Sequence, residues 1–385
     1  MIREISVKNF KSLENTGANL SNINILTGVN GRGKSSFLQT LMVLSQTWIK
    51  DQYRSLLPQG CWKSLGVFDD IRNSFCGDEN IEIRIKTDDP GENDFLLRYS
   101  RNHDKETLGE LAAFNVNGNA ISVSSDEEMG DDDFPHDNDF PSEATTEPAT
   151  LASIADYAPL TKLKRMFYIS SDRIAAKAKE QLDENTDFLH ADGSNILNFL
   201  YRQDKEVVKA VEQVLNEIFD GAVLNIDLND QDIVLRMNSE NGTKLYRPEN
   251  VGFGFSYALS VATAIVISKE QDILIIENPE AHLHPSAQSM ALHLLITNAL
   301  EKGFQLFVET HSDHVVNAAL LEIRRENSRC NNENVEILFF SNIPSEIGDS
   351  QSNIKNLNIT PKGRILNPPR QFCDQYAKDI RELYC

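Results

Sequence analysis

Residues 28–35 of the chain, GVNGRGKS, have the residue types and spacing of a phosphate-binding loop, G-x-x-x-x-G-K-[ST]. The glycines allow the backbone to fold so tightly that successive N–H groups face one phosphate. Lys34 is expected to reach the β- and γ-phosphates of a nucleotide, and the Ser35 hydroxyl to ligate Mg²⁺. The nucleotide-binding residues expected in and beside this loop are Gly28, Asn30, Gly31, Arg32, Gly33, Lys34, Ser35 and Ser36.

The segments on both sides of this loop support the interpretation. Residues 23–27, INILT, are short and β-prone, as expected of a buried strand, and Lys34–Trp48 places its apolar residues at helical spacing. A helix that begins at the loop adds the positive end of its dipole to the phosphate site. The alternative, a glycine turn that joins a strand to a helix by chance, accounts less well for the full motif in this context.

Polar residues also follow two other apolar segments. Glu277 ends the apolar strand Ile273–Ile276, and a carboxylate there can hold the water shell of Mg²⁺ opposite the phosphate loop. His311 comes just after the apolar strand Gln305–Val308, and a residue at the carboxyl end of a parallel strand faces the ligand crevice. His311 is therefore a candidate donor to the γ-phosphate, with a capping or core histidine as the alternative.

The H-x-H sequence and the cysteines are weak candidates for a metal site. His282 and His284 flank Leu283, and a structural turn beside Pro285 is favoured over a metal pair. The five cysteines are scattered and form no C-x-x-C, which argues against structural zinc or a redox dithiol. Reduced thiols in the cytoplasm fit this usage best.

The order of apolar strands and helices predicts an α/β fold. Short apolar strands alternate with helices in the C-terminal half, which indicates a mixed, largely parallel central sheet flanked by helices. Residues 49–120 combine strands with loops, and IEIRI at residues 81–85 alternates cleanly, so we expect an N-terminal β-rich lobe. The chain has no internal repeat and no sustained heptads, which excludes a long coiled coil.

Charge and hydropathy restrict the surroundings of the protein. The formal net charge is −21, and residues 126–147 carry ten carboxylates without any Lys or Arg. Residues 123–150 have few large apolar groups, so we expect an acidic disordered insertion there, with an acidic switch as the alternative. A net-acidic chain is a poor general DNA binder, although a local basic groove would still allow DNA contact.

Neither a membrane span nor a secretory signal is apparent. The longest apolar run, Ala258–Ser268, is about half of the roughly 20 residues that a membrane helix needs. Residues 1–10 alternate like a strand and lack the apolar core of a signal peptide. We therefore expect a cytoplasmic protein.

The motifs occur in the order found in the ABC-type ATPase heads of RecF-like, SMC-like and OLD-like proteins, which the chain resembles. Strand Ile5–Phe10 and the following Lys11-Ser12 are similar to their opening segment, where the basic residue approaches the nucleotide. Residues 277–285 resemble their Walker B and D-loop run, and residues 309–312 their switch-histidine segment. The resemblance implies that Lys11 binds ATP. It further implies that the catalytic residues are Glu277, Glu280 and His311. It also implies that Ser35 and Glu277 are the ligands of Mg²⁺.

Residues 250–257, NVGFGFSY, resemble the signature segment of these heads. In the family, a serine and the following helix N-terminus cap the γ-phosphate of ATP bound to the opposite protomer. The resemblance implies that Gly252, Gly254 and Ser256 contact ATP held by a second copy. It therefore implies a homodimer or a higher even-numbered oligomer that closes around ATP.

The C-terminal segment is similar to that of a group of bacterial AAA/ABC-type ATPases, many of them from anti-phage defence operons. The similarity rests on Ile359–Ile365 and on scattered residues that include Phe372 and Leu383, and the whole resemblance covers most of residues 1–48 and 165–385. It implies an ATP-gated dimer that controls a separate effector, a nuclease or a toxin. A RecF/SMC-like DNA-clamping ATPase of DNA repair is the alternative, and a nucleotide-binding scaffold with almost no turnover is a third hypothesis.

One position departs from the family pattern. Asn278 stands where the heads place a general-base Glu directly after the Walker B carboxylate. Asn can orient a water molecule but cannot take its proton, so either Glu280 substitutes or hydrolysis is slow. We divide the chain into a first part of the head with the phosphate loop and β lobe (1–122), the acidic insertion (123–150) and a second part of the head with the signature, Walker B, switch histidine and tail (151–385).

Overall fold

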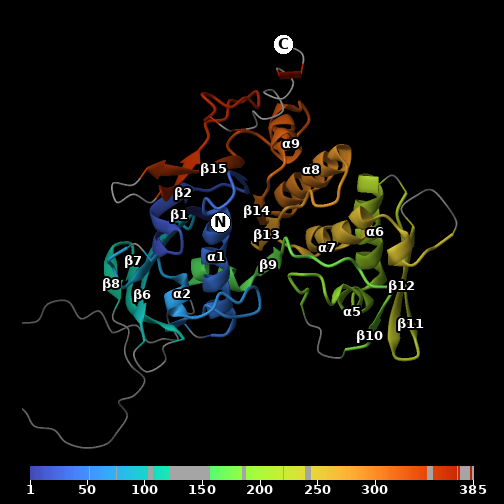
Figure 1. Cartoon of the computed structure of the whole chain (residues 1–385), viewed down its shortest axis with the longest axis horizontal. Coiled ribbons are helices and arrows are strands. Elements are labelled where there is room, and N and C mark those ends of the chain that lie inside the picture. Colours follow the sequence, from blue (N-terminus) through green and yellow to red (C-terminus); the bar gives the residue numbers. More distant parts are fainter. Residues whose placement is uncertain are drawn as a thin grey trace, which may run out of the picture.

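The computed structural model describes most of the chain. The described residues are 1–51, 53–74, 76–102, 107–121, 157–183, 188–219, 221–238, 244–344, 350–370, 372 and 382–383. The predicted acidic insertion, residues 123–150, lies outside them. Within them, the chain combines three sheets with helices on their faces (Figure 1).

A six-stranded sheet forms the centre of the molecule, in the order β16-β15-β3-β14-β13-β9. Five of its strands are parallel, and only β16 at one edge runs antiparallel to its neighbour. The strands are β3 (Ile23–Gly28), β9 (Met166–Ile169), β13 (Ile273–Glu277), β14 (Gln305–Glu309), β15 (Val335–Pro344) and β16 (Ser350–Asn356). The predicted α/β fold with a mixed, mostly parallel sheet is confirmed.

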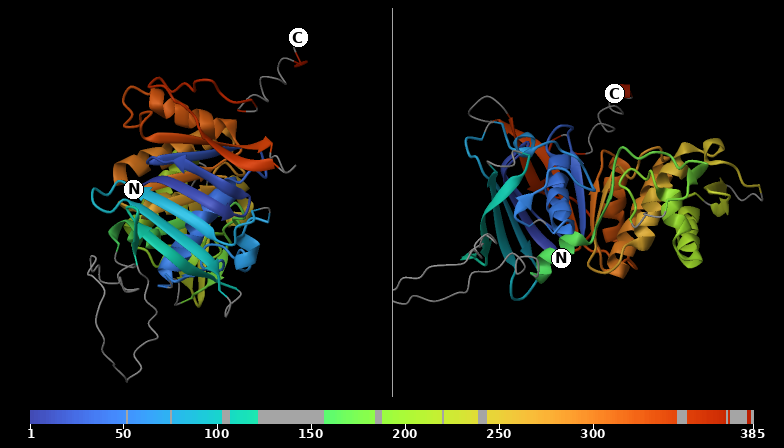
Figure 2. Two further views of the ribbon diagram at one scale, coloured as in Figure 1. Left: turned by 90° about the vertical axis from the view of Figure 1, so that its left-hand side faces the viewer. Right: turned by 90° about the horizontal axis from the view of Figure 1, so that it is seen from below.

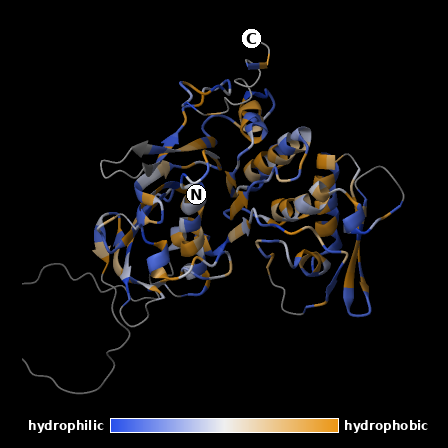
Figure 3. Ribbon diagram, in the orientation of Figure 1, coloured by the Kyte–Doolittle hydropathy of each residue, from blue (hydrophilic) through white to orange (hydrophobic). Residues whose placement is uncertain are grey.

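The central strands are apolar because both faces of this sheet are covered. Every residue of β13 and β14 is buried, and both strands are drawn largely orange in Figure 3. The helices α7 (Phe253–Ile267), α8 (Pro285–Lys302) and α9 (Asp313–Arg324) pack on one face within a single core. Helix α7 is buried along most of its length, which explains its lack of a polar side.

Helix α1 (Lys34–Ile49) covers the other face and is itself covered by a second sheet (Figure 2). This sheet is antiparallel, in the order β2-β1-β5-β6-β7-β4 with β8 beside β7, which confirms the predicted N-terminal β-rich lobe. Its strand bounds are β1 (Ile2–Phe10), β2 (Leu13–Asn19), β4 (Ser55–Leu56), β5 (Ile81–Thr87), β6 (Asp94–Arg101), β7 (Gly109–Val116) and β8 (Asn119–Ile121). Phe37 and Leu41 of α1 are fully buried between the two sheets.

A third, three-stranded sheet and two helices form a lobe beside α7 (Figure 1). These elements are β10 (Lys179–Gln181), β11 (Val223–Asn229), β12 (Asp232–Asn238), α5 (Ile196–Tyr201) and α6 (Lys205–Phe219). The short helical segments elsewhere are α2 (Phe68–Ile71), α4 (Ala158–Thr161), η1 (Lys162–Lys164) and η2 (Pro248–Asn250). No helix of the described residues is long and apolar enough to cross a membrane.

The described part of the C-terminal tail packs back onto α9. Ile359 pairs with Ile365 in an isolated antiparallel bridge, and both contact the core below α7–α9. Gly363 has φ +65°, and a Cβ there would lie 2.2 Å from the Leu320 carbonyl oxygen of α9. A glycine is therefore needed where the tail turns against the helix.

Candidate functional site

The phosphate loop joins β3 to α1, as the sequence predicts. Its first and last glycines hold backbone conformations that other residues rarely adopt, with φ +131° at Gly28 and +93° at Gly33, the N-cap of α1. A Cβ on Gly28 would lie 2.2 Å from the Phe340 carbonyl oxygen of the neighbouring strand β15. The glycines therefore allow both the turn and the close approach of β15.

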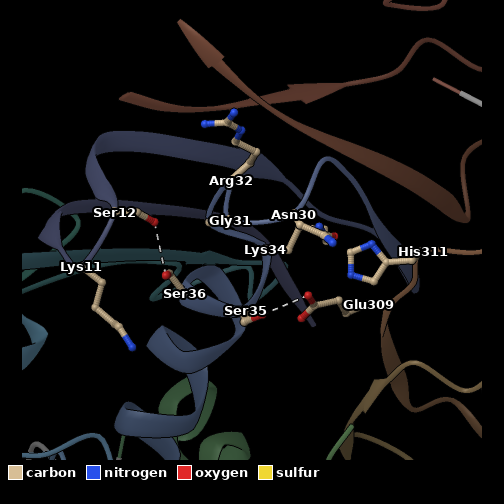
Figure 4. A pocket seen from close by; sticks show the side chains of 11 residues that line it. Lys11, Ser12, Asn30, Gly31, Arg32, Lys34, Ser35, Ser36, Glu309 and His311 are labelled. Carbon is tan, nitrogen blue, oxygen red and sulfur yellow. Dashed lines mark hydrogen bonds between the residues drawn. The ribbon is translucent and has the colours of Figure 1, made fainter. Parts of the chain in front are cut away.

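A pocket of about 390 Å³ opens above this loop (Figure 4). Its walls come from the end of β1, the loop, the start of α1 and the end of β14. The lining residues are Lys11, Ser12, Asn30, Gly31, Arg32, Gly33, Lys34, Ser35, Ser36, Glu309 and His311. The structure thus brings Lys11, which follows the first strand, and His311, which lies far along the chain, to the loop residues. Of the predicted loop residues, only Gly28 lies outside the lining.

Lys34 is held at the base of the pocket. Its ammonium donates to the carbonyl oxygens of Gly28 and Val29, at 3.0 and 3.1 Å. Burial lowers the pKa of Lys34, and the nearby Glu309 carboxylate opposes that change. Lys11, on the opposite wall, donates to Gln39 Oε1 at 2.8 Å, and burial also lowers its pKa.

Glu309 lines the pocket as well, although the sequence analysis does not name it as a site residue. The Ser35 hydroxyl donates to Glu309 Oε1 at 3.0 Å, whereas Glu309 Oε2 is buried without a hydrogen-bond partner. Burial and the charge of the neighbouring Glu277 together raise the pKa of Glu309 to about 7, although Ser35 and Lys34 oppose the rise. The signal was available, because β14 ends in a carboxylate in the same way as β13 does.

Glu277 lies one strand farther from the loop and does not line the pocket. Its carboxylate is buried and accepts a hydrogen bond from the Ser171 backbone N–H, at 3.1 Å. No hydrogen bond joins Ser35 to Glu277 in the described structure. Glu309 is the carboxylate in contact with Ser35. That Ser35 and Glu277 are both ligands of Mg²⁺ stays a prediction.

The buried Arg173, which follows β9, fixes the end of β13. Its guanidinium donates to the carbonyl oxygens of Ser170, Glu277 and Asn278, at 2.8, 2.7 and 2.7 Å. Burial lowers the pKa of Arg173 to about 10, although the charges of Glu280 and Glu277 oppose this. Sequence analysis missed Arg173, and its only signal was a charged residue just after an apolar strand.

The turn after β13 carries the two residues that the family pattern places near the reacting water. Asn278 has φ +46°, a left-handed conformation that Asn adopts more readily than Glu does. Glu280 Oε1 accepts hydrogen bonds from the Thr310 hydroxyl and the His311 backbone N–H, both at 2.9 Å. Glu280 therefore positions the His311 segment.

His311 lines the pocket on the side opposite Lys11 (Figure 4). Burial lowers its pKa, and the charge of Lys34 lowers it further. The ring is therefore neutral at pH 7, with a nitrogen able to donate one hydrogen bond.

The first turn of α7 differs from the predicted signature. The helix begins at Phe253 with Gly252 as its N-cap, and Phe253 is 70% exposed. Ser256 is only 2% exposed, and its hydroxyl contacts Met237 Sδ at 3.9 Å. Ser256 therefore lies one turn past the N-cap, on the core side of the helix. Its contact with ATP held by a second copy stays a prediction.

Gly254, in the first turn of α7, packs against the turn that contains His282 and His284. A Cβ on Gly254 would lie 2.5 Å from the His282 carbonyl oxygen, and the His282 ring lies 4.4 Å from the Tyr257 ring. His284 is the N-cap of α8 and accepts from the Ser286 backbone N–H. His282 and His284 thus lie in a structural turn, as the sequence predicts for H-x-H. No group of three or more His, Cys, Asp or Glu in the described part could hold a metal alone.

Known families match nearly all of the chain. A family described as an AAA ATPase domain matches residues 1–231 and 170–316, and a family of unknown function matches residues 330–383. The Old nuclease of Escherichia phage P2 is 24% identical over 352 residues, which cover 82% of this chain and 57% of that protein. The chain therefore spans little more than half the length of this relative.

Solved Smc heads share the fold. A crystal structure of the Smc head bound to the C-winged helix domain of ScpA covers 92% of this chain and 98% of its own, with 15% identity and a TM-score of 0.54. The Smc head with an extended coiled coil, bound to the C-terminal domain of ScpA from Pyrococcus furiosus, covers 100% and 99%, with 14% identity and a TM-score of 0.51.

Proposed function

Since the chain belongs to the AAA ATPase domain family, we propose that it binds ATP with Mg²⁺ in the pocket above residues 28–36 and hydrolyses it slowly. The observation that carries this proposal is the pocket itself. It joins the phosphate loop to Lys11 after β1 and to Glu309 and His311 at the end of β14, so that three separate parts of the chain contribute to it. Its volume of about 390 Å³ lies within the range of small-molecule sites.

Each wall of the pocket has a role that follows from its chemistry. The N–H groups of the loop and the start of α1 receive the phosphates, and the Lys34 ammonium balances their charge. The neutral His311 ring can donate to the γ-phosphate. Mg²⁺ would be held by Ser35 and by a carboxylate at the end of β13 or of β14. When bound, it screens the charge of the phosphate oxygens.

Slow hydrolysis follows from the turn after β13. Asn278 can orient a water molecule but cannot accept its proton, and its left-handed backbone disfavours the usual Glu. Glu280 is engaged with Thr310 and His311 through Oε1, while its Oε2 is buried without a partner. Positioning and charge balance then supply most of the catalysis.

ATP turnover by Glu280→Gln tests this division of roles. Because the substitution loosens the His311 segment, we expect turnover to fall about tenfold or more while ATP affinity changes little. Turnover equal to that of the wild type would remove Glu280 from the mechanism. Lys34→Ala provides the background rate of a protein without a functional loop.

We further propose that two copies close around ATP, so that the first turn of α7 from one copy covers the pocket of the other. Gly252 and Phe253 are exposed at this helix end, where free N–H groups can face an anion. The fold of Smc heads is consistent with this arrangement. Light scattering should show a doubled mass when ATP is added to the wild type and no change for Lys34→Ala.

The biological role that we propose is control of a separate effector, a nuclease or toxin, in anti-phage defence. The similarity to the Old nuclease supports it, although this chain spans only 57% of that protein. Closure around ATP would change the surface that the effector contacts. Copurification with the products of neighbouring genes tests it: an ATP-dependent change in the mass of the complex is expected, and a mass independent of ATP would contradict gating.

A DNA-clamping ATPase is the second candidate, because the fold is that of Smc heads. The net charge of −21 counts against it, since DNA affinity depends largely on phosphate neutralisation. A gel shift on duplex DNA separates the two candidates. ATP-dependent retention at moderate salt would favour DNA clamping.

A further inference from the structure

We propose that Glu309, rather than Glu277, is the carboxylate that shares the divalent cation with Ser35, an inference that rests on the proposed ATP site. The geometry at the end of β14 points to this assignment. Glu309 Oε1 accepts the Ser35 hydroxyl at 3.0 Å, and both side chains line the same pocket (Figure 4). Glu309 thus already contacts the hydroxyl that the phosphate loop contributes to the cation.

The second oxygen of Glu309 lacks a partner. Glu309 is 6% exposed, and its Oε2 has no hydrogen bond although it is buried beside the pocket. A buried carboxylate oxygen without a donor is costly, because it has lost its water and gained nothing in exchange. A cation, directly or through one of its water molecules, would satisfy this oxygen.

Glu277 is committed to another contact. Its Oε2 accepts the Ser171 backbone N–H at 3.1 Å, and its carbonyl oxygen accepts from Arg173 at 2.7 Å. These contacts tie Glu277 to the loop after β9, on the side of β13 that faces away from β14. Its carboxylate still adds negative charge beside Glu309, which favours a cation at that place.

The strand order explains why these roles separate. Strand β14 lies between β3, which leads into the phosphate loop, and β13. The register aligns Glu309 with both Leu26 of β3 and Glu277 of β13. Adjacent strands are about 4.8 Å apart, so the end of β14 is nearer to the loop than the end of β13 by about one strand spacing.

The donor set fits Mg²⁺ bound together with a nucleotide. Mg²⁺ prefers oxygen ligands and in nucleotide sites takes one or two protein oxygens, with phosphate oxygens and water filling its octahedron. Ser35 and Glu309 offer a hydroxyl and a carboxylate, and no group of three or more His, Cys, Asp or Glu among the described residues makes a cage. The protein therefore supplies few of the ligands of Mg²⁺, and the loss of one protein oxygen should weaken the binding of the cation strongly.

The test compares ATP affinity in Mg²⁺ and in EDTA for the wild type, Glu309→Gln and Glu277→Gln. For Glu309→Gln we expect the gain in affinity from Mg²⁺ to fall about tenfold or more. In EDTA its affinity should be unchanged or higher, because a negative charge beside the phosphates is gone. Glu277→Gln should change the gain less than about threefold, and Mn²⁺ binding in the presence of ATP, followed by electron paramagnetic resonance, should weaken in the same order.

Glu336→Gln is the matched control. Glu336 is a partly buried carboxylate of the same sheet, but it pairs with Asn24 at the opposite end of β3 and accepts from Asn356. This variant should keep the full Mg²⁺ dependence. Glu309→Asp, which retains the charge on a shorter side chain, should recover part of what Glu309→Gln loses.

The inference is overturned if Glu309→Gln keeps the wild-type gain from Mg²⁺, or if Glu277→Gln loses as much as Glu309→Gln does. A wild type that does not bind ATP in either condition would instead refute the proposed function. The two failures are therefore distinguishable in the same set of titrations.

Discussion

The phosphate loop and the first turn of α7 both contain glycines at the start of a helix, yet their predicted site residues differ in exposure. Residues 30–36 of the loop all line one pocket. In α7, Ser256 is 2% exposed whereas Phe253 is 70% exposed. A site made of consecutive backbone groups is fixed once its glycines are in place, whereas a site that depends on one side chain changes when the helix begins a few residues earlier.

One methyl group added to a glycine in each segment should have very different effects on stability. Gly28→Ala places a Cβ 2.2 Å from the Phe340 carbonyl oxygen at φ +131°, so we expect the free energy of unfolding to fall by about 4 kcal/mol. Gly252 has ordinary backbone angles and no atom within 4 Å of such a Cβ, so Gly252→Ala should cost less than about 1 kcal/mol. Urea unfolding measures both, and similar losses would contradict the difference.

The loop side should also show a pH dependence that α7 does not supply. The pKa of Glu309 is about 7 in the folded state against 4.5 ordinarily, so the folded protein retains a proton that the unfolded chain releases in this window. Stability contributed by this group is therefore complete below pH 4.5 and is lost as the pH rises to about 7, by up to about 3 kcal/mol. The measurement is urea unfolding at several pH values in EDTA.

Glu309→Gln should flatten this part of the profile, because the amide does not titrate. An unchanged slope between pH 4.5 and 7 in the variant would assign the dependence to other groups. The control Ser256→Ala, on the α7 side, should keep the wild-type slope.

Phe253 is the exposed ring at the start of α7. Phe253→Ala removes an exposed ring, so unfolding and ATP binding should stay close to the wild type. If this helix end meets a second copy, ATP-dependent dimerisation should weaken about tenfold, which corresponds to about 1.4 kcal/mol. Sedimentation in the presence of ATP measures it, and unchanged dimerisation would mean that the ring lies outside the contact.

The smallest effect on stability is expected at Asn278, in the turn after β13. Asn278 has φ +46°, so Asn278→Ala should cost about 1 kcal/mol, whereas Asn278→Gly should be nearly neutral. Thermal unfolding of the two variants tests this. Equal stabilities would show that the left-handed conformation contributes little there.

The sequence predicts best those features of the fold and the site that depend only on residues close together in the chain. Fully apolar strands such as Ile273–Ile276 identify the buried sheet, and the spacing from Gly28 to Ser35 identifies the loop. The contact between Ser35 and Glu309 depends on which strand lies beside β3, and strand order is a property of the whole sheet. The burial of Ser256 depends on the position of the helix start, and Arg173 gains its role only when β9 pairs with β13.

Binding of ATP at the loop of residues 28–36 can be tested by calorimetric titration of Lys34→Ala with ATP and Mg²⁺. The matched control is Lys8→Ala, which removes an ammonium on β1 that pairs with Asp78 and does not line the pocket. We predict that Lys34→Ala weakens ATP binding at least about 100-fold, or about 2.7 kcal/mol, while Lys8→Ala binds as the wild type does. Equal affinity of Lys34→Ala and the wild type would place the nucleotide elsewhere and contradict the account.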